Sequence, residues 1–409
     1  MTDTTSARTA VSAAEGGITA PLGFRSAALH CGIKTSDLDL VILAADATAT
    51  AAALFTSNLV KAAPVILSQE HLRRTGGRVR AIVVNSGCAN ACTGDDGMRD
   101  ARSMAAMAAD ATGCPPEEVL VASTGVIGVA LDMPAIASGI ATAARVLTRG
   151  QGASAARAIM TTDRFPKEGA VTVRTERGSF TVGGMAKGAG MIEPRMATML
   201  GFLFTDAAVD PSLLHRALQD TAQQTFNAIT VDGDSSTNDS LVALASGASG
   251  VTVDEPLYPA LVEGMVALSR ELATAIVRGG EGATKLVAVT VSGAPGYSEA
   301  QTVARTIANS LLVKTAVHGE DPNWGRILAA AGRAGVVFDP ARAMVRVGGT
   351  LLFENGLPHD DASPQAAEHL QGETIAIDVD LGFSPGASAT IWTCDLSAEY
   401  VRINGEYRT

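Results

Sequence analysis

The chain has 409 residues, of which 47% are hydrophobic and 18% are charged, and its formal net charge at pH 7 is −11. This length and hydrophobic content are typical of a well-buried globular protein with two or three domains, and they exclude a largely disordered chain. The acidic balance, with no cluster of lysine and arginine to offset it, argues against a nucleic-acid-binding surface and favours small-molecule partners.

Short apolar runs rich in β-forming residues alternate with alanine-rich helical patterns in the first half of the chain. This alternation predicts an α/β fold with strands long enough for large sheets. The expected strands lie at 38–43, 79–84, 119–122, 171–173 and 180–182, and the expected helices at 100–110 and 133–147.

The second half begins with an expected strand at 200–204 and not with a linker. Two helices follow, from Asp210 to about 228 and from Tyr258 to 277, and each carries a proline at a permissive early position. A strand at 285–291 precedes the composition break Ala294-Pro295-Gly296, which suits a domain boundary. We therefore expect one domain over 1–291 and a smaller α/β domain over 292–409. Its expected elements are a helix at 299–312 and strands around 335–338, 344–347, 374–379 and 389–393.

Neither residues 1–17 nor the later apolar stretches have the pattern of a signal peptide or a membrane-spanning helix. Residues 1–17 are polar and alanine-rich, and they lack a basic segment followed by an apolar core. No later stretch of about 18 residues, the length needed to span a bilayer, avoids charge and glycine. We expect a soluble, cytoplasmic protein with no membrane partner.

The side chains also give no metal or cofactor motif. Five cysteines spread through the chain argue against a disulfide framework and predict free thiols. Cys88 and Cys92 have no second Cys or His pair at zinc-site spacing, and the Asp-rich segment 231–239 lacks the closing Glu of a calcium loop. The glycine-rich segments 76–77 and 279–282 are too short for a phosphate-binding fingerprint. We expect neither metal nor organic cofactor.

The most informative stretch is the glycine-rich segment 183–200, which runs into Thr198 between apolar residues. Glycines tolerate positive φ, Pro194 fixes one φ, and a small residue, Ala197, precedes the threonine, so the peptide bond before Thr198 can be held strained and accessible. An N→O acyl shift there, followed by hydrolysis, would leave Thr198 with a free α-amine of pKa about 7.7–8.0 beside its own hydroxyl. The alternative interpretation is a glycine-rich loop that leads into a buried strand, 196–204.

The segment 187–200, KGAGMIEPRMATML, resembles the hallmark of the ornithine acetyltransferase family, the glutamate N-acetyltransferases of arginine biosynthesis. Similar blocks follow one another over nearly the whole chain, at 20–24 (APLGF), 55–58 (FTSN), 85–94 (NSGCANACTG), 123–128 (STGVIG), 161–163 (TTD), 231–239 (VDGDSSTND), 318–326 (HGEDPNWGR) and 401–409 (VRINGEYRT). The resemblance implies the αββα sandwich of the N-terminal-nucleophile aminopeptidase superfamily, with a smaller C-terminal α/β domain that contributes to the substrate site.

The activity implied by this resemblance is a self-cleaving acetyltransferase. Cleavage between Ala197 and Thr198 would give an α chain, 1–197, and a β chain, 198–409, which assemble as an α2β2 heterotetramer. An acetyl group would move from N2-acetyl-L-ornithine to L-glutamate by a ping-pong route through acetyl-Thr198. Whether acetyl-CoA also serves as a donor stays open.

A tetrahedral oxyanion at Thr198 needs preorganised donors, and the turn at Thr124 and Gly125 can supply a hydroxyl and a backbone N–H where the expected strand 119–122 ends. The family uses its matching Thr-Gly pair as the oxyanion hole. Its pattern also implies that Lys187 faces the substrate carboxylate and Glu320 the ammonium end. The implied substrate-binding set is Thr161, Lys187, Thr198, Glu320, Asn404 and Thr409.

Four residues depart from the family pattern, and two alternatives to the main hypothesis stay open. Glu193 stands where a small residue is common and Arg195 where asparagine is common, while Cys88 replaces an asparagine and Gly279 an aspartate. The first two departures bear on the cleavage rate and the acceptor range. The alternatives are an aminopeptidase or amidase of the same superfamily, in which water is the acceptor, and a non-catalytic small-molecule-binding homologue.

Overall fold

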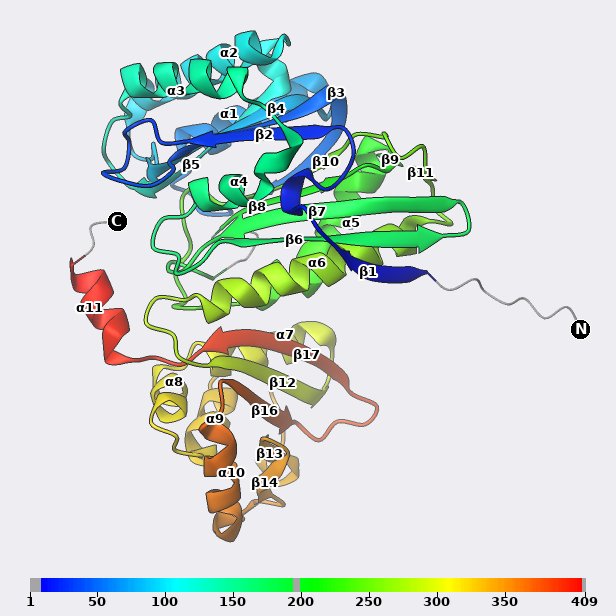
Figure 1. Ribbon diagram of the computed structural model, residues 1–409. Helices are drawn as coiled ribbons and strands as arrows, with labels where there is room; N and C mark the ends of the chain where they lie inside the picture. Colours follow the sequence, from blue (N-terminus) through cyan, green and yellow to red (C-terminus); the bar gives the residue numbers. More distant parts are fainter. Residues whose placement is uncertain (1–8, 194–198, 407–409) are drawn as a thin grey trace, which may run out of the picture.

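The structure is a computed structural model that describes residues 9–193 and 199–406 (Figure 1). Ala197, Thr198 and Thr409, which the sequence assigns to cleavage, catalysis and substrate binding, lie outside the described residues.

A nine-stranded sheet forms the centre of the larger unit, and its long strand β3 (Leu40–Phe55) belongs to two groups of strands. The first part of β3, from Leu40, pairs with β2 and β4, whereas the part ending at Phe55 pairs with β10. The pairing with β4 shifts register between Ala44 and Ala49. The first group comprises β2 (Phe24–Leu29), β3, β4 (Arg78–Cys88) and β5 (Val119–Val126). The second group comprises β1 (Ala10–Ala14), β6 (Lys167–Thr175), β7 (Gly178–Lys187), β8 (Leu200–Thr205) and β10 (Ser240–Ala245).

The two groups of strands face each other across a common hydrophobic core. Val41 and Leu43 of the first group and Phe202 of the second belong to one buried cluster. The rings of Phe24 and Phe204 cross this interface with centroids 4.5 Å apart. Because side chains alternate across a strand, the opposite faces of both groups carry further apolar residues that need cover.

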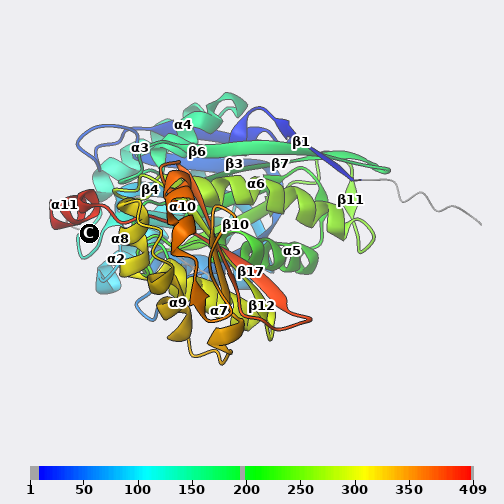
Figure 2. The same ribbon diagram turned by 90° about the horizontal axis from the view of Figure 1, so that it is seen from below.

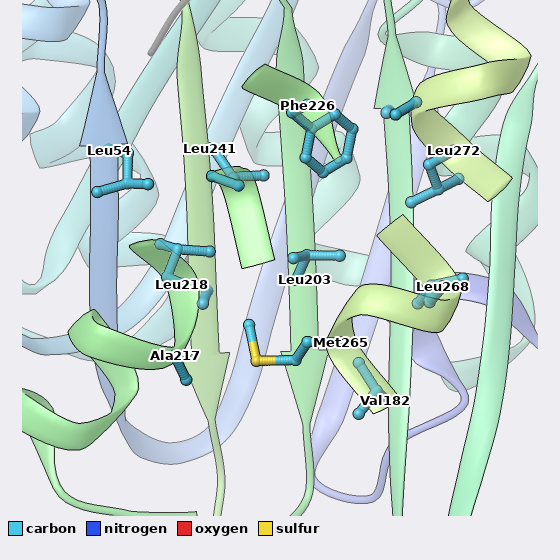
Figure 3. Close-up of a cluster of buried hydrophobic side chains, with 14 of the residues drawn as sticks. Leu54, Val182, Leu203, Ala217, Leu218, Phe226, Leu241, Met265, Leu268 and Leu272 are labelled. Carbon is cyan, nitrogen blue, oxygen red and sulfur yellow. The ribbon is translucent and has the colours of Figure 1, made fainter. Parts of the chain in front are cut away.

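Helices provide that cover on both outer faces (Figure 1). Buried residues of α2 (Gly94–Thr112) and α3 (Met133–Arg145) pack with residues of β3 and β4, and α1 (Ala63–Thr75) joins the same cluster. On the other side α5 (Pro211–Gln224) and α6 (Tyr258–Arg278) cover β7, β8 and β10, where Leu218 and Leu268 meet Leu203 and Leu241 (Figure 3). The larger unit is therefore an αββα sandwich, and the expected α/β fold class is confirmed.

The C-terminal unit is built on a six-stranded sheet of order β15-β14-β13-β16-β12-β17. Its strands are β12 (Leu286–Ala294), β13 (Met344–Val347), β14 (Thr350–Glu354), β15 (Leu357–Pro358), β16 (Thr374–Asp380) and β17 (Ala387–Cys394). Its helices are α7 (Tyr297–Ala308), α8 (Leu311–His318), α9 (Trp324–Gly332) and α10 (Ser363–Leu370). The last helix, α11 (Ala398–Glu406), stands to one side of this unit (Figure 2).

Smaller elements complete the described chain. They are α4 (Gly152–Ala158), the paired strands β9 (Ala208–Val209) and β11 (Thr252–Val253), and the 3-10 turns at Gly17–Thr19, Pro116–Glu118, Arg149–Gln151, Phe226–Ala228, Pro340–Arg342 and Asp360–Ala362. All five cysteines are free thiols. Over the ranges that the structure describes, no helix is long and apolar enough to cross a membrane.

Several elements differ from those expected in the C-terminal half. The predicted boundary between 291 and 292 falls inside β12, so the six-stranded sheet already begins at Leu286. The helix expected at 299–312 is two helices, because Asn309 caps α7 and the Ser310 side chain accepts from Val313 N to start α8. The strand expected at 335–338 is irregular chain. The strand that pairs with β13 on that side is β14, and β15 lies at the edge beyond it.

Candidate active site

A cavity of about 230 Å³ lies where β5 and β7 end, and residues from both groups of strands, from loops and from α11 line it. It is lined by Ala89, Thr124, Gly125, Ile127, Thr161, Thr162, Lys187, Gly190, Met191, Asp232, Asp234, Asn238, Glu281, Tyr400 and Asn404. Acidic groups and one lysine thus share a small space, which suits a zwitterionic small molecule.

Lys187 is the last residue of β7, and its buried side chain reaches across to β5 in the facing layer. Its Nζ donates a 3.0 Å hydrogen bond to Oγ1 of Thr124. Burial lowers the pKa of Lys187, while the carboxylate of Asp163 opposes that shift. The strand ends therefore bring together a buried amine and a hydroxyl from residues 63 positions apart.

Asp163 is a fully buried carboxylate that accepts hydrogen bonds from the chain before β6, from the first residue of β6 and from the loop after Lys187. Its Oδ1 accepts from Gly188 N at 2.7 Å and from Nζ of Lys167 at 2.6 Å, and its Oδ2 accepts from Thr161 N at 3.0 Å. Burial alone would raise the pKa of Asp163, but the cations Lys187 and Lys167 outweigh it and lower the pKa to about 2. Asp163 is therefore the anion that balances the two buried lysines.

The variant Asp163→Asn is expected to lower the free energy of unfolding by about 3 kcal/mol at neutral pH, because it leaves Lys167 buried without its partner. The folded-state pKa lies below the ordinary value of 3.8, so this stabilisation is present above about pH 4 and is lost as the pH falls toward about 2. Denaturant titrations at several pH values check both statements. As a control, Asp254→Asn breaks an exposed ion pair and should cost under about 1 kcal/mol. Equal losses in the two variants would contradict the buried-anion account.

Thr124 and Gly125 lie within β5, which runs on to Val126, and not in a turn after its end. Gly125 has φ +132°, and a Cβ there would lie 2.3 Å from the carbonyl carbon of Gly87, so only glycine fits. Because Lys187 donates to Oγ1 of Thr124, the hydroxyl proton of Thr124 is available to another acceptor. The pair can therefore present donors to an oxygen in the cavity.

Glu281 is the buried carboxylate of the cavity, and the sequence analysis did not select it. Its backbone N donates to Ala189 O at 2.9 Å, and its Oε2 accepts from Nδ2 of Asn404 at 2.8 Å. A Cβ on Gly190 would lie 2.4 Å from the same Oε2, so the glycine-rich loop closes directly onto this carboxylate. The signal available in the sequence was an acidic residue framed by glycines at 279–282.

Helix α11 closes the cavity from the C-terminal side through two residues. Asn404 contacts Glu281, and the hydroxyl of Tyr400 donates to Oδ2 of Asp232 at 3.3 Å. Burial raises the pKa of Asp232, although backbone N–H groups of Met191 and Ile192 oppose the shift. Helix α11 therefore contributes Tyr400 and Asn404 to the lining of the cavity.

Of the site residues selected from sequence, Thr124, Gly125, Thr161, Lys187 and Asn404 line this cavity. Glu320 is not brought to it. It follows α8 with φ +58°, its side chain is 46% exposed, and its Oε1 pairs with Nζ of Lys285 at 3.3 Å. Among the described residues, the carboxylates that line the cavity are those of Asp232, Asp234 and Glu281, and Glu281 is the one that bonds Asn404.

Two of the departures from the family pattern have local explanations. Cys88 is buried, and its Sγ lies 3.4 Å from Val129 O. At Gly279 a Cβ would lie 3.3 Å from Nζ of Lys167, so a carboxylate there would face that lysine. In this chain Lys167 pairs with Asp163 instead. Among the described residues, no group of three or more His, Cys, Asp or Glu is arranged to hold a metal ion.

Comparison with known proteins adds relatives over almost the full chain. The pattern of the ArgJ family matches residues 25–409. The arginine biosynthesis bifunctional protein ArgJ of Symbiobacterium thermophilum is 47% identical over 400 residues, which covers 96% of this chain and 99% of that protein. The protein of the same name from Chlorobium chlorochromatii is 50% identical over 394 residues, covering 95% and 91%.

Two solved structures are also similar in sequence. The ornithine acetyltransferase of Mycobacterium tuberculosis, solved in complex with ornithine, is 42% identical, covers 47% of this chain and 100% of that chain, and has a TM-score of 0.42. The ArgJ protein of Bacillus halodurans is 38% identical, covers 47% and 98%, and has a TM-score of 0.43.

The sandwich, its cavity and these relatives define an enzyme of the acyltransferase class. The chain belongs to the ArgJ family, whose curated members named above are bifunctional proteins of arginine biosynthesis. The family resemblance inferred from the sequence blocks is thereby confirmed.

Proposed function

We propose that this protein is a self-cleaving acetyltransferase that moves an acetyl group from N2-acetyl-L-ornithine to L-glutamate through Thr198. The observation that carries the proposal is the cavity in which Lys187 and Thr124 are hydrogen-bonded, with Glu281 and Asn404 paired in the same space. Such an arrangement offers hydroxyl and amide donors for an oxyanion and charges of both signs for an amino-acid substrate.

Maturation begins with attack of the Thr198 hydroxyl oxygen on the carbonyl carbon of Ala197. The C–N bond of that peptide breaks, the hydroxyl proton passes to the nitrogen, and an ester joins the two residues. Water then hydrolyses the ester, which gives the Ala197 carboxylate and restores the Thr198 hydroxyl beside the α-amine that the acyl shift freed. The α-amine has an ordinary pKa near 7.7–8.0, so it can act as the base for the adjacent hydroxyl.

In the first half of the transfer, the Thr198 hydroxyl attacks the acetyl carbonyl of N-acetylornithine while the α-amine takes its proton. Thr124 and Gly125 hold the oxyanion, the acetyl C–N bond breaks, and ornithine leaves with the proton on its amine. In the second half, the amine of glutamate attacks the acetyl ester, the C–O bond breaks, and Thr198 recovers its hydroxyl proton. This is a ping-pong route that needs no metal and no organic cofactor.

The two ends of each substrate require opposite charges in the cavity. Lys187 is assigned to the substrate carboxylate and Glu281 to the ammonium end, with Thr161 and Asn404 as neutral partners. Glu281 takes the role that the sequence pattern implied for Glu320. The assignment of Thr409 to the same set rests on the family pattern alone.

Two further features are part of the proposal. An acetyl thioester is chemically as suitable an acyl donor to Thr198 as an acetyl amide, so acetyl-CoA is a candidate second donor, in keeping with a bifunctional enzyme.

The cleaved halves share one sandwich, because β7 and β8 pair across the segment that separates them. We therefore propose an αβ unit that associates as α2β2, located in the cytoplasm.

Self-cleavage is tested by the intact mass of the purified protein together with N-terminal sequencing. Two fragments of about 20 and about 22 kDa are expected, in proportion to 197 and 212 of 409 residues in a 41.7 kDa chain. The larger should begin at Thr198, and Thr198→Ala should remain whole. A single chain in the wild type, or cleavage of Thr198→Ala, would remove the N-terminal nucleophile from the proposal.

A further inference from the structure

Glu193 is the last described residue before the proposed cleavage segment, and its side chain is paired and largely buried. Oε1 lies 2.8 Å from Nη1 of Arg305, and both side chains are only 12% exposed. Oε2 accepts a 3.0 Å hydrogen bond from Nδ2 of Asn309. Because a carboxylate away from water is costly unless paired, these two partners fix where Glu193 can lie. We call the three residues Glu193, Arg305 and Asn309 the clamp.

The clamp connects the chain before the cleavage segment to the C-terminal unit. Arg305 lies in the last turn of α7, and Asn309 caps that helix. Arg305 also donates to the carbonyl oxygens of Asn227 and Ile229. The opposite face of α7, including Val303 and Ile307, is fully buried in the core of the C-terminal unit, so the helix presents its two polar residues from a rigid base.

The backbone on the upstream side of Glu193 is held as well. Asp232 accepts from Met191 N at 2.6 Å and from Ile192 N at 2.8 Å, and Val231 N donates to Ile192 O at 2.8 Å. Met191 has φ +56°, a left-handed conformation that residues other than glycine rarely adopt. Such a conformation persists only where the surroundings impose it, which indicates that this stretch is fixed.

The chain is also held where the described residues resume. Met199 O accepts from Ser240 N at 3.0 Å, and Leu200 starts β8 between β7 and β10. The downstream end is thus held by the nine-stranded sheet of the larger unit, whereas the Glu193 side chain at the upstream end is held by α7 of the C-terminal unit through the clamp.

We propose that the clamp sets the rate of self-cleavage by fixing the chain just upstream of the bond between Ala197 and Thr198. The inference rests on the proposed function, and it makes Glu193, Arg305 and Asn309 positioning residues, since the described geometry gives them no contact with the cavity. An intramolecular attack is fast only while the attacking hydroxyl and the carbonyl carbon are held close together in the right orientation. Release of one end of the reacting segment therefore lowers the rate of cleavage without changing the bonds that form and break. The C-terminal unit is then required for maturation as well as for the substrate site.

The test follows conversion of newly synthesised full-length chain to fragments, by intact mass, in the wild type and in clamp variants. Glu193→Ala should slow cleavage at least about tenfold, since it removes a charge-assisted pair. Glu193→Gln keeps an acceptor for Asn309 but not the charge, so its rate of cleavage should lie between that of the wild type and that of Glu193→Ala. Arg305→Ala should match Glu193→Ala, and the double variant should be no slower than either single variant.

Two further readouts separate positioning from a general loss of stability. After prolonged incubation to full cleavage, Glu193→Ala should have wild-type kcat and KM. Lys314→Met removes another buried cation of the C-terminal unit, one that donates to Oγ1 of Thr393 at 2.9 Å, and it should cleave at the wild-type rate while its melting temperature falls.

The outcomes distinguish the clamp from the function on which it rests. If the wild type is cleaved and Glu193→Ala is cleaved equally fast, or if Lys314→Met slows cleavage as much, the clamp is wrong and the acetyltransferase proposal stands. If the wild-type chain stays whole, both fall together.

Discussion

Replacing Lys187 by methionine is expected to lower kcat/KM for acetyl transfer by about 10³. The change removes the donor to Thr124 Oγ1, so the threonine hydroxyl is no longer directed toward the position of an oxyanion. It also removes the cation assigned to the substrate carboxylate, which is one of the two lysines that lower the pKa of Asp163. Steady-state kinetics on protein that has been shown by mass to be cleaved gives the result free of maturation effects.

Lys314→Met is the matched control for this prediction, because Lys314 is also a buried lysine that donates to a threonine hydroxyl, at 2.9 Å. It lies in α8, away from the residues that line the cavity. Its kcat/KM should stay within about twofold of the wild type at temperatures where the protein is folded. Similar losses in the two variants would mean that Lys187 matters only for stability.

Exchanging Glu281 for glutamine is expected to raise KM for N-acetylornithine about 100-fold, with a smaller effect on kcat. The glutamine has nearly the same shape but cannot supply the negative charge for the ammonium end of the substrate. Glu281 is buried, lies against Gly190 and is hydrogen-bonded to Asn404. Water therefore has little access to solvate the ammonium group of the substrate once the carboxylate charge is lost. Initial rates over a wide range of donor concentration measure the effect.

Glu320→Gln provides the paired comparison, since the sequence pattern pointed to Glu320 and the geometry points to Glu281. Glu320 is half exposed and pairs with Lys285 outside the lining of the cavity, so its variant should keep KM within about twofold. A large rise in KM for Glu320→Gln with none for Glu281→Gln would overturn the assignment.

Several residues that line the cavity could be selected from the sequence because they occur in short blocks that resemble those of a known family. Lys187 stands at the junction of a β-rich run and a glycine-rich loop, and Thr124 follows an apolar strand pattern. Their selection came from their places in blocks that resemble the family, because taken singly each is typical of an ordinary loop lysine or strand-to-turn transition. The α/β class followed from the same alternation of apolar runs and helical patterns.

The rest depended on contacts that no local pattern contains. Glu281 lines the cavity only because the fold places it against Gly190, which lies 91 positions earlier in the chain, and periodicity gives no sign of that contact. The extension of β3 to 16 residues runs through alanines, which have little strand preference of their own and are held there by pairing on both sides. The break between α7 and α8 was missed because a serine N-cap interrupts an otherwise continuous apolar pattern.

The role of Glu193 illustrates the same point for maturation. In the sequence it is a charged residue in a glycine-rich loop, which suggests a solvated side chain. Its partners, Arg305 and Asn309, come from more than 100 positions further along the chain. Only the docking of α7 against the loop shows that this carboxylate is enclosed and paired.

The central claim, that Thr198 carries the acetyl group, is tested most directly by the mass of the fragment that begins at Thr198 after incubation with N-acetylornithine alone. The account predicts one added acetyl group on that fragment, release of an equal amount of ornithine, and loss of the added mass when glutamate is supplied. Transfer of acetyl to glutamate by a protein whose fragment never gains that mass would contradict the account.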